Sequence, residues 1–148
     1  MRGRQTAPRQ WFIVLDEAII ADPKRWRRGD GVLVLRRLDS SSMRRLRQLA
    51  GMHGLTVIRE GPRAAARVHD ARELRRALSA RTPNIFLSPL YPTASHPTWK
   101  PLPRMRAAAL ARLGGRRLLA LGGMDARKFK RIKCLGFRGW AGISAFRT

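Results

Sequence analysis

Two hydroxyl side chains stand two residues apart in a stretch rich in proline and serine. Thr93 and Ser95 lie within residues 88–103 (SPLYPTASHPTWKPLP), a sequence that cannot be helical and exceeds the usual length of a connection. At alternate positions the two hydroxyls can point the same way and donate to one phosphate or carboxylate. The alternative is ordinary turn chemistry, in which Thr and Ser bond their own backbone.

A pair of glycines, Gly122 and Gly123, stands between an apolar run and Asp125, a residue type that commonly caps a helix. Because glycine has no Cβ, the backbone N–H groups at such a place can approach an anion closely. The same pair also suits a tight strand-to-helix turn that needs glycine for its backbone angles alone. The residues therefore indicate either a phosphate cradle or a tight turn.

The elements that must position these groups are short apolar runs alternating with arginine-rich helical stretches. This order predicts a parallel sheet with right-handed crossovers. A complete eight-stranded barrel needs about 200 residues or more, and this chain has 148. We therefore predict an α/β fold, a reduced TIM-type (β/α) barrel with six to seven strands instead of eight.

The expected strands are residues 11–17, 31–38, 55–61, a vestige around Val68-His69, a run from Asn84, 117–123 and 139–146. The expected helices begin at Ser40-Ser41-Ser42, after the cap Asp70, near residue 104 and after the cap Asp125, with Gly51 or Gly54 ending the first.

The composition indicates one domain, residues 11–148, preceded by a basic tail, residues 1–10. A lone cysteine, Cys134, excludes an internal disulfide and a thiolate metal cluster, and we expect it to be a small buried residue. A membrane span needs about 18 consecutive apolar residues, and the sequence has no such run. We therefore expect a cytoplasmic protein with no membrane partner.

The charge is strongly positive, because 32 basic residues face nine acidic ones and give a formal net charge of +23. Such a field can bind nucleic acid by releasing counterions from phosphates. The basic residues are spread over the whole chain, however, and aromatic residues make up only 7% of it. A dedicated nucleic-acid module concentrates its charge and adds aromatic side chains for stacking. The composition alone therefore favours a solvated basic surface over nucleic-acid binding as the main function.

Two segments of the second half resemble the thiamine phosphate synthase family. FLSPLYPTASHP (86–97) is similar to the family's signature strand and Pro-Thr loop, and LALGGMDARKFKRIKCLGFRGWAGISAF (119–146) is similar to its last two strands. The resemblance covers residues 11–146, most strongly from residue 84. Thiazole tautomerases share the fold and its phosphate site, so the resemblance alone leaves the reaction open.

The resemblance implies roles for several residues. Thr93 and Ser95 match hydroxyl residues that contact substrate, and His96 stands where a lysine usually binds the pyrophosphate of the second substrate. In the family, the corner between the last two strands holds a thiazole phosphate, as barrel phosphate sites commonly do. The residues that match it are Gly122, Gly123, Ile143 and Ser144.

Arg36 matches an arginine of the family's second strand, and a guanidinium can clamp a diphosphate by two hydrogen bonds. His69 matches a histidine that acts as an acid/base group in the tautomerases. The alternative for Arg36 is a solvated arginine at a strand end. The alternative for His69 is a structural histidine held near a helix start.

The synthase reaction implies Mg²⁺, because the departing pyrophosphate carries charge that the metal and its carboxylates neutralise. The family's third strand supplies Asn-Asp, where this chain has Arg59-Glu60. The fourth strand and its helix, which supply a further Asp, are missing between Gly61 and Arg67. Glu60 is then either a surviving ligand or a loop acid among arginines, and we favour the second. Asp16 and Glu17 are nearby alternatives.

Three hypotheses follow. The first is coupling of hydroxymethylpyrimidine diphosphate to thiazole phosphate, as in thiamine biosynthesis. The second is metal-free thiazole tautomerisation through His69. The third is a catalytically decayed barrel that binds a phosphorylated ligand or nucleic acid. In each enzymatic case the partners are phosphorylated small-molecule substrates, and exposed strand edges of a shortened barrel favour a homodimer.

Overall fold

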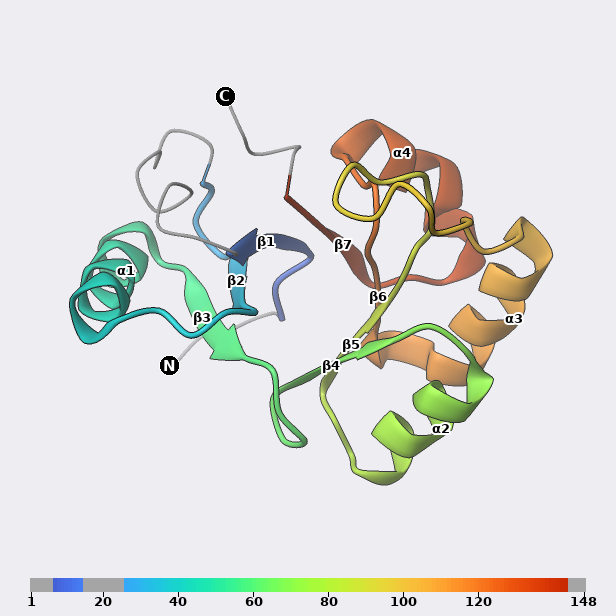
Figure 1. Ribbon diagram of the computed structural model, residues 1–148, viewed down its shortest axis with the longest axis horizontal. Coiled ribbons are helices and arrows are strands. Elements are labelled where there is room, and N and C mark those ends of the chain that lie inside the picture. The colour runs from blue at the N-terminus through green and yellow to red at the C-terminus, as the bar shows by residue number, and fades with distance from the viewer. Residues whose placement is uncertain (1–6, 15–25, 144–148) are drawn as a thin grey trace, which may run out of the picture.

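Seven parallel strands form a nearly closed barrel (Figure 1), which confirms the predicted α/β fold with fewer than eight strands. The computed structural model describes residues 7–14 and 26–143. The strand order is β3-β2-β1-β7-β6-β5-β4. The strands are β1 (Gln10–Val14), β2 (Gly31–Val34), β3 (Thr56–Arg59), β4 (Ala65–Val68), β5 (Asn84–Leu87), β6 (Leu118–Ala120) and β7 (Gly139–Gly142).

Four α-helices follow strands β2, β4, β5 and β6 and lie outside the barrel. They are α1 (Ser40–His53), α2 (Ala71–Ser79), α3 (Arg104–Gly114) and α4 (Ala126–Ile132), with two 3-10 turns, η3 (Gly115–Arg117) and η4 (Lys133–Leu135). Three of the helices begin at an aspartate whose side chain accepts a backbone N–H. These are Asp39 for α1, Asp70 for α2 and Asp125 for α4. The sequence predicted the last two caps, whereas the cap of α1 is Asp39, which precedes the serine triplet.

The barrel interior is filled by alternate strand residues. Trp11 and Ile13 of β1 point inward and pack with Phe86 of β5, whereas Phe12 and Val14 pack with a different, outer cluster. The rings of Trp11 and Phe86 meet edge to face, with centroids 5.6 Å apart. Gly31 of β2 leaves room for the Trp11 ring, which a Cβ at that position would strike. Both faces of β1, β2, β6 and β7 are buried apart from the half-buried Gln10, which is why these strands read as apolar runs, whereas β3 is exposed or half-buried along its length.

The barrel is open between β3 and β4. These are the two ends of the sheet order, and the connection between them has no helix and only an isolated antiparallel bridge from Gly61 to Ala65. An eighth strand would close the barrel at this place, so the gap agrees with a missing strand and helix between Gly61 and Arg67. β4 itself is a full strand, because all four of its residues pair with β5. The sequence predicted only a vestige of this strand at Val68-His69 and so underestimated its length.

Three other features differ from the sequence prediction or limit it. Cys134 is exposed, so the prediction of a buried thiol was wrong. The strands end earlier than the apolar runs, as in β2, which stops at Val34. No helix in the described ranges is long and apolar enough to cross a membrane.

Replacing Leu74, the fully buried residue of α2, with alanine should lower the free energy of unfolding by about 2–5 kcal/mol. The loss has two parts, the buried methyl groups and the cavity that remains. Urea unfolding followed by circular dichroism measures it. The control is Arg75→Ala on the exposed face of the same helix, which should change stability by less than about 0.5 kcal/mol. Equal costs for the two variants would show that α2 does not pack as described.

Candidate functional site

The carboxyl ends of the strands surround a cavity of about 140 Å³. This volume exceeds the space that a single water needs several-fold. The cavity brings together most of the residues that the sequence singled out. They are His69, Thr93, Ser95, His96, Gly122, Gly123 and Ile143. Ser144 lies outside the described residues, as do Asp16 and Glu17.

The long loop 88–103 supplies part of the cavity wall, and one of its two hydroxyl side chains bonds the backbone of the loop itself. The Thr93 Oγ1 accepts a hydrogen bond from the backbone N–H of Ser95 at 3.3 Å. Thr93 therefore makes the ordinary turn contact while still lining the cavity. Ser95 and His96 are exposed at the same mouth.

Trp99, which the sequence analysis did not single out, joins two histidines of the cavity. Its ring stacks on His96, with centroids 4.0 Å apart and planes 9° from parallel. It meets His69 edge to face, with centroids 5.3 Å apart. The Trp99 side chain is 43% exposed, so the cavity has an aromatic wall that solvent and ligands can reach.

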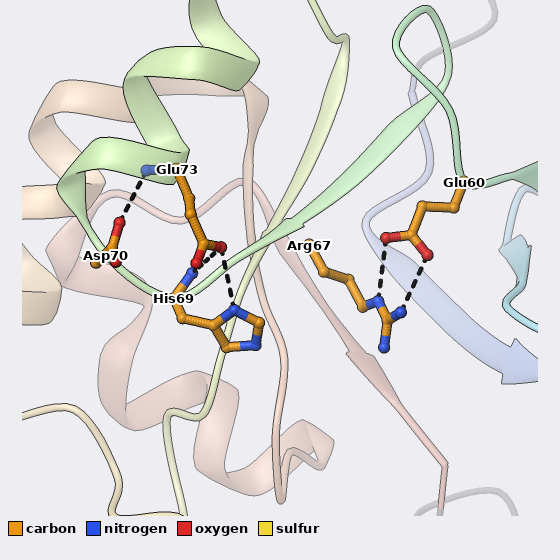
Figure 2. A network of polar contacts seen from close by, with 5 residues as sticks. All are labelled: Glu60, Arg67, His69, Asp70 and Glu73. Carbon is orange, nitrogen blue, oxygen red and sulfur yellow. Dashed lines mark hydrogen bonds and ion pairs between the residues drawn. The ribbon is translucent and has the colours of Figure 1, made fainter.

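His69 is held by a carboxylate of the helix that follows it (Figure 2). The Glu73 Oε2 lies 3.2 Å from the His69 Nδ1 and also accepts the His69 backbone N–H at 3.2 Å. The backbone N–H of Glu73 in turn donates to the Asp70 carboxylate at 2.8 Å. This is close to a capping box, in which the third helical residue reaches back to the helix start. The start of α2 thus fixes the orientation of the His69 ring.

The two glycines are required by packing against the long loop. Gly122 and Gly123 have φ of 97° and 60°, and a Cβ on Gly123 would strike the carbonyl oxygen of Pro92. The Gly122 carbonyl accepts the Tyr91 N–H at 3.1 Å. Lys128 donates from its Nζ to the Gly123 carbonyl at 2.8 Å. These contacts establish the tight-turn role; the phosphate role stays a prediction.

Glu60 is paired with an arginine that the sequence analysis did not select. Arg67 donates from Nε and Nη2 to the two Glu60 oxygens at 3.2 and 3.1 Å (Figure 2). Arg67 lines the cavity, whereas Glu60 does not. No group of three or more His, Cys, Asp or Glu side chains that could hold a metal occurs in residues 7–14 and 26–143. A single carboxylate engaged by arginine does not fit Mg²⁺, which needs several oxygen ligands.

Arg36 lies just after β2, with an exposed side chain, and is not among the residues that line the cavity. Its neighbour Leu35 lines the cavity instead. The structure therefore brings Arg67, not Arg36, to the cavity as its guanidinium.

No protein-family model and no curated protein matches the sequence. Among solved structures, the chain is similar to a thiamine phosphate pyrophosphorylase from Pyrococcus furiosus, with a TM-score of 0.69, 12% identity, and coverage of 95% of this chain and 88% of that one. A structure described as native KDPGal has a TM-score of 0.49 and 12% identity, covering 91% of this chain and 82% of that one. The first likeness shows the fold, a TIM-like α/β barrel.

Replacing Gly123 with alanine should lower the free energy of unfolding by about 1–3 kcal/mol more than the same change at Gly115. Gly115 also has a positive φ, 59°, but open space where the Cβ would lie, so alanine there meets backbone strain without a clash. Urea unfolding of both variants tests this. A Gly115→Ala variant that is as unstable as Gly123→Ala would show that the loop does not press on Gly123.

Proposed function

We propose that this protein acts on a phosphorylated small molecule of thiamine biosynthesis by a metal-free proton transfer, as in thiazole tautomerisation. The observation that carries the proposal is the His69–Glu73 pair, because it presents an oriented imidazole to a cavity of small-molecule size. A carboxylate on Nδ1 holds the tautomer that carries its proton there, which leaves Nε2 as the base.

The proposed reaction needs only this one group. Nε2 of His69 takes a proton from one position of the ligand ring, and the imidazolium that forms is stabilised by the Glu73 carboxylate 3.2 Å away. The same nitrogen returns the proton at a second position, and the double bonds shift between the two. Protons and electrons balance within the ligand, so the isomerisation requires no oxidant, co-substrate or metal.

Cationic and aromatic groups at the cavity support a ligand that is both phosphorylated and aromatic. Arg67 supplies a guanidinium, the group that best matches phosphate oxygens. Its Nε and Nη2 bond Glu60, so Nη1 is the donor left for the ligand. His96 is a second nitrogen donor at the mouth. Trp99 is 43% exposed and adds an aromatic side chain beside the site, with one face covered by His96.

The second candidate is the coupling of hydroxymethylpyrimidine diphosphate to thiazole phosphate, and the fold likeness to a thiamine phosphate pyrophosphorylase favours it. That reaction releases pyrophosphate and depends on Mg²⁺ to neutralise the charge. The described donor set does not fit Mg²⁺, and the Glu60 carboxylate is already paired with Arg67. We therefore place isomerisation first.

His69→Ala should lower kcat for isomerisation of a phosphorylated thiazole tautomer by about 10²–10⁴-fold, the usual contribution of a general acid/base group. Glu73→Gln should lower kcat with KM little changed, because the base is then misoriented while the ligand contacts remain. Proton exchange and product can be followed by NMR. Arg75→Gln is the control, since this side chain is exposed on the outer face of α2 and lies outside the cavity. Unchanged turnover in His69→Ala would remove the proposal.

The purified protein should form no thiamine phosphate from hydroxymethylpyrimidine diphosphate and thiazole phosphate, even at high enzyme concentration with Mg²⁺. The reason is the lack of a fitting metal donor set among the described residues. Chromatographic detection of thiamine phosphate measures this. Metal-dependent product would instead establish the coupling reaction.

A further inference from the structure

The outer face of α2 carries three arginines that line one shallow groove. Arg72, Arg75 and Arg76 are exposed, and together with Ser79 they form its walls. Their spacing of three and four residues places them on the same side of the helix. The groove is separate from the cavity, with which it shares no lining residue.

These arginines have no carboxylate partner among the described residues. Only two ion pairs occur there, Arg67 with Glu60 and His69 with Glu73. The two acids at the start of α2 are engaged elsewhere, because Asp70 accepts the backbone N–H of Glu73, and Glu73 accepts from His69. Three adjacent positive charges therefore stand without local neutralisation.

We propose that this face of α2, defined by Arg72, Arg75 and Arg76, is a binding site for the phosphate backbone of a nucleic-acid duplex. Arg72 and Arg76 are about 6 Å apart along the helix axis, from a rise of about 1.5 Å per residue. Neighbouring phosphates of one strand lie about 7 Å apart, because each step advances about 3.4 Å along the duplex axis and also winds around it. Arg72 and Arg76 thus match one pair of neighbouring phosphates, and the long side chain of Arg75 beside them can reach a third.

The lack of large exposed apolar side chains on α2 favours a nucleic-acid duplex over a protein, a membrane or a single strand as the partner. The exposed large hydrophobic residues in the described ranges are Met52, Trp99, Met105 and Leu113, and none belongs to α2. A protein interface has aromatic or aliphatic anchors at its core, and a membrane-bound helix has an exposed apolar face. Binding of single strands relies on aromatic stacking, which α2 does not offer. Charge alone indicates a duplex backbone contacted without sequence preference.

The test is fluorescence anisotropy of the full chain with a labelled duplex of mixed sequence at 50–200 mM salt. Binding weakens as salt rises, and each arginine that contacts a phosphate adds about 0.9 to the magnitude of the negative slope of log K against log salt. The variant Arg72→Gln/Arg75→Gln/Arg76→Gln should therefore reduce the magnitude of the slope by about 2.7. A duplex should also bind more tightly than a single strand of the same length.

The control is Arg44→Gln/Arg45→Gln/Arg47→Gln in α1. These are three exposed arginines on the opposite side of the barrel (Figure 1), and the variant loses the same charge. It should change the slope by less than about 1. Equal losses in both variants would show that the binding is diffuse and overturn the assignment to α2. So would the absence of duplex binding at 50 mM salt, or tighter binding to poly-glutamate or anionic vesicles.

His69→Ala should bind the duplex as the unaltered protein does. The duplex proposal therefore stands or fails independently of the proposed isomerisation.

Discussion

The pairing of β1 with β7 is the contact on which the rest of the barrel depends. β3 and β4 do not pair, so this ladder is the link within the sheet between the first three described strands and the last four. It runs in register from Gln10 with Trp140 to Phe12 with Gly142. Gly139 makes the approach possible, because a Cβ there would strike the carbonyl oxygen of Arg9. The Trp140 N–H donates to that same carbonyl at 2.8 Å.

This ladder also determines where the cavity lies. Parallel strands arranged around a barrel present their carboxyl ends at one face, so residues from distant parts of the chain meet there. Ile13 of β1 and Ile143 after β7 line one side, while His69 after β4 lines another. The opening between β3 and β4 does not disturb this grouping. Most residues that line the cavity lie at the carboxyl ends of β4, β5, β6 and β7 or in the long loop after β5.

Much of the fold could be predicted because both faces of most strands are buried. β2 (GVLV) and β6 (LLA), for example, are short apolar runs with every residue buried. β4 was underestimated because Ala65, Ala66 and Arg67 carry little strand preference, and its pairing with β5 overrides that preference. The exposure of Cys134 depends on how η4 turns at the end of α4, which apolar spacing does not reveal.

The sequence analysis selected the loop residues of the candidate site and missed the residues that hold or surround them. His69 was visible at a strand-to-helix junction, but its partner Glu73 was overlooked although Asp70 and Glu73 have the spacing of a capping box. Arg67 could not be selected among 32 basic residues, because only the fold brings it to the cavity. The position of Trp99 depends on the path of the long loop, which is fastened where the Leu102 N–H donates to the Pro89 carbonyl.

The scarcity of acids connects the chemistry of the cavity to that of the surface. Every acidic residue in the described ranges is hydrogen-bonded to a backbone N–H, an arginine or a histidine. They are Asp30, Asp39, Glu60, Asp70, Glu73 and Asp125. Burial also raises the pKa of Asp30.

Described carboxylates that are committed to helix caps and pairs are not available to gather around Mg²⁺, whereas one carboxylate is enough to orient His69. The same imbalance leaves the arginines of α2 without carboxylate partners among the described residues, which is why we propose phosphate as their ligand. The proposed metal-free isomerisation and the proposed duplex site thus share one cause, the scarcity of acidic residues in this chain.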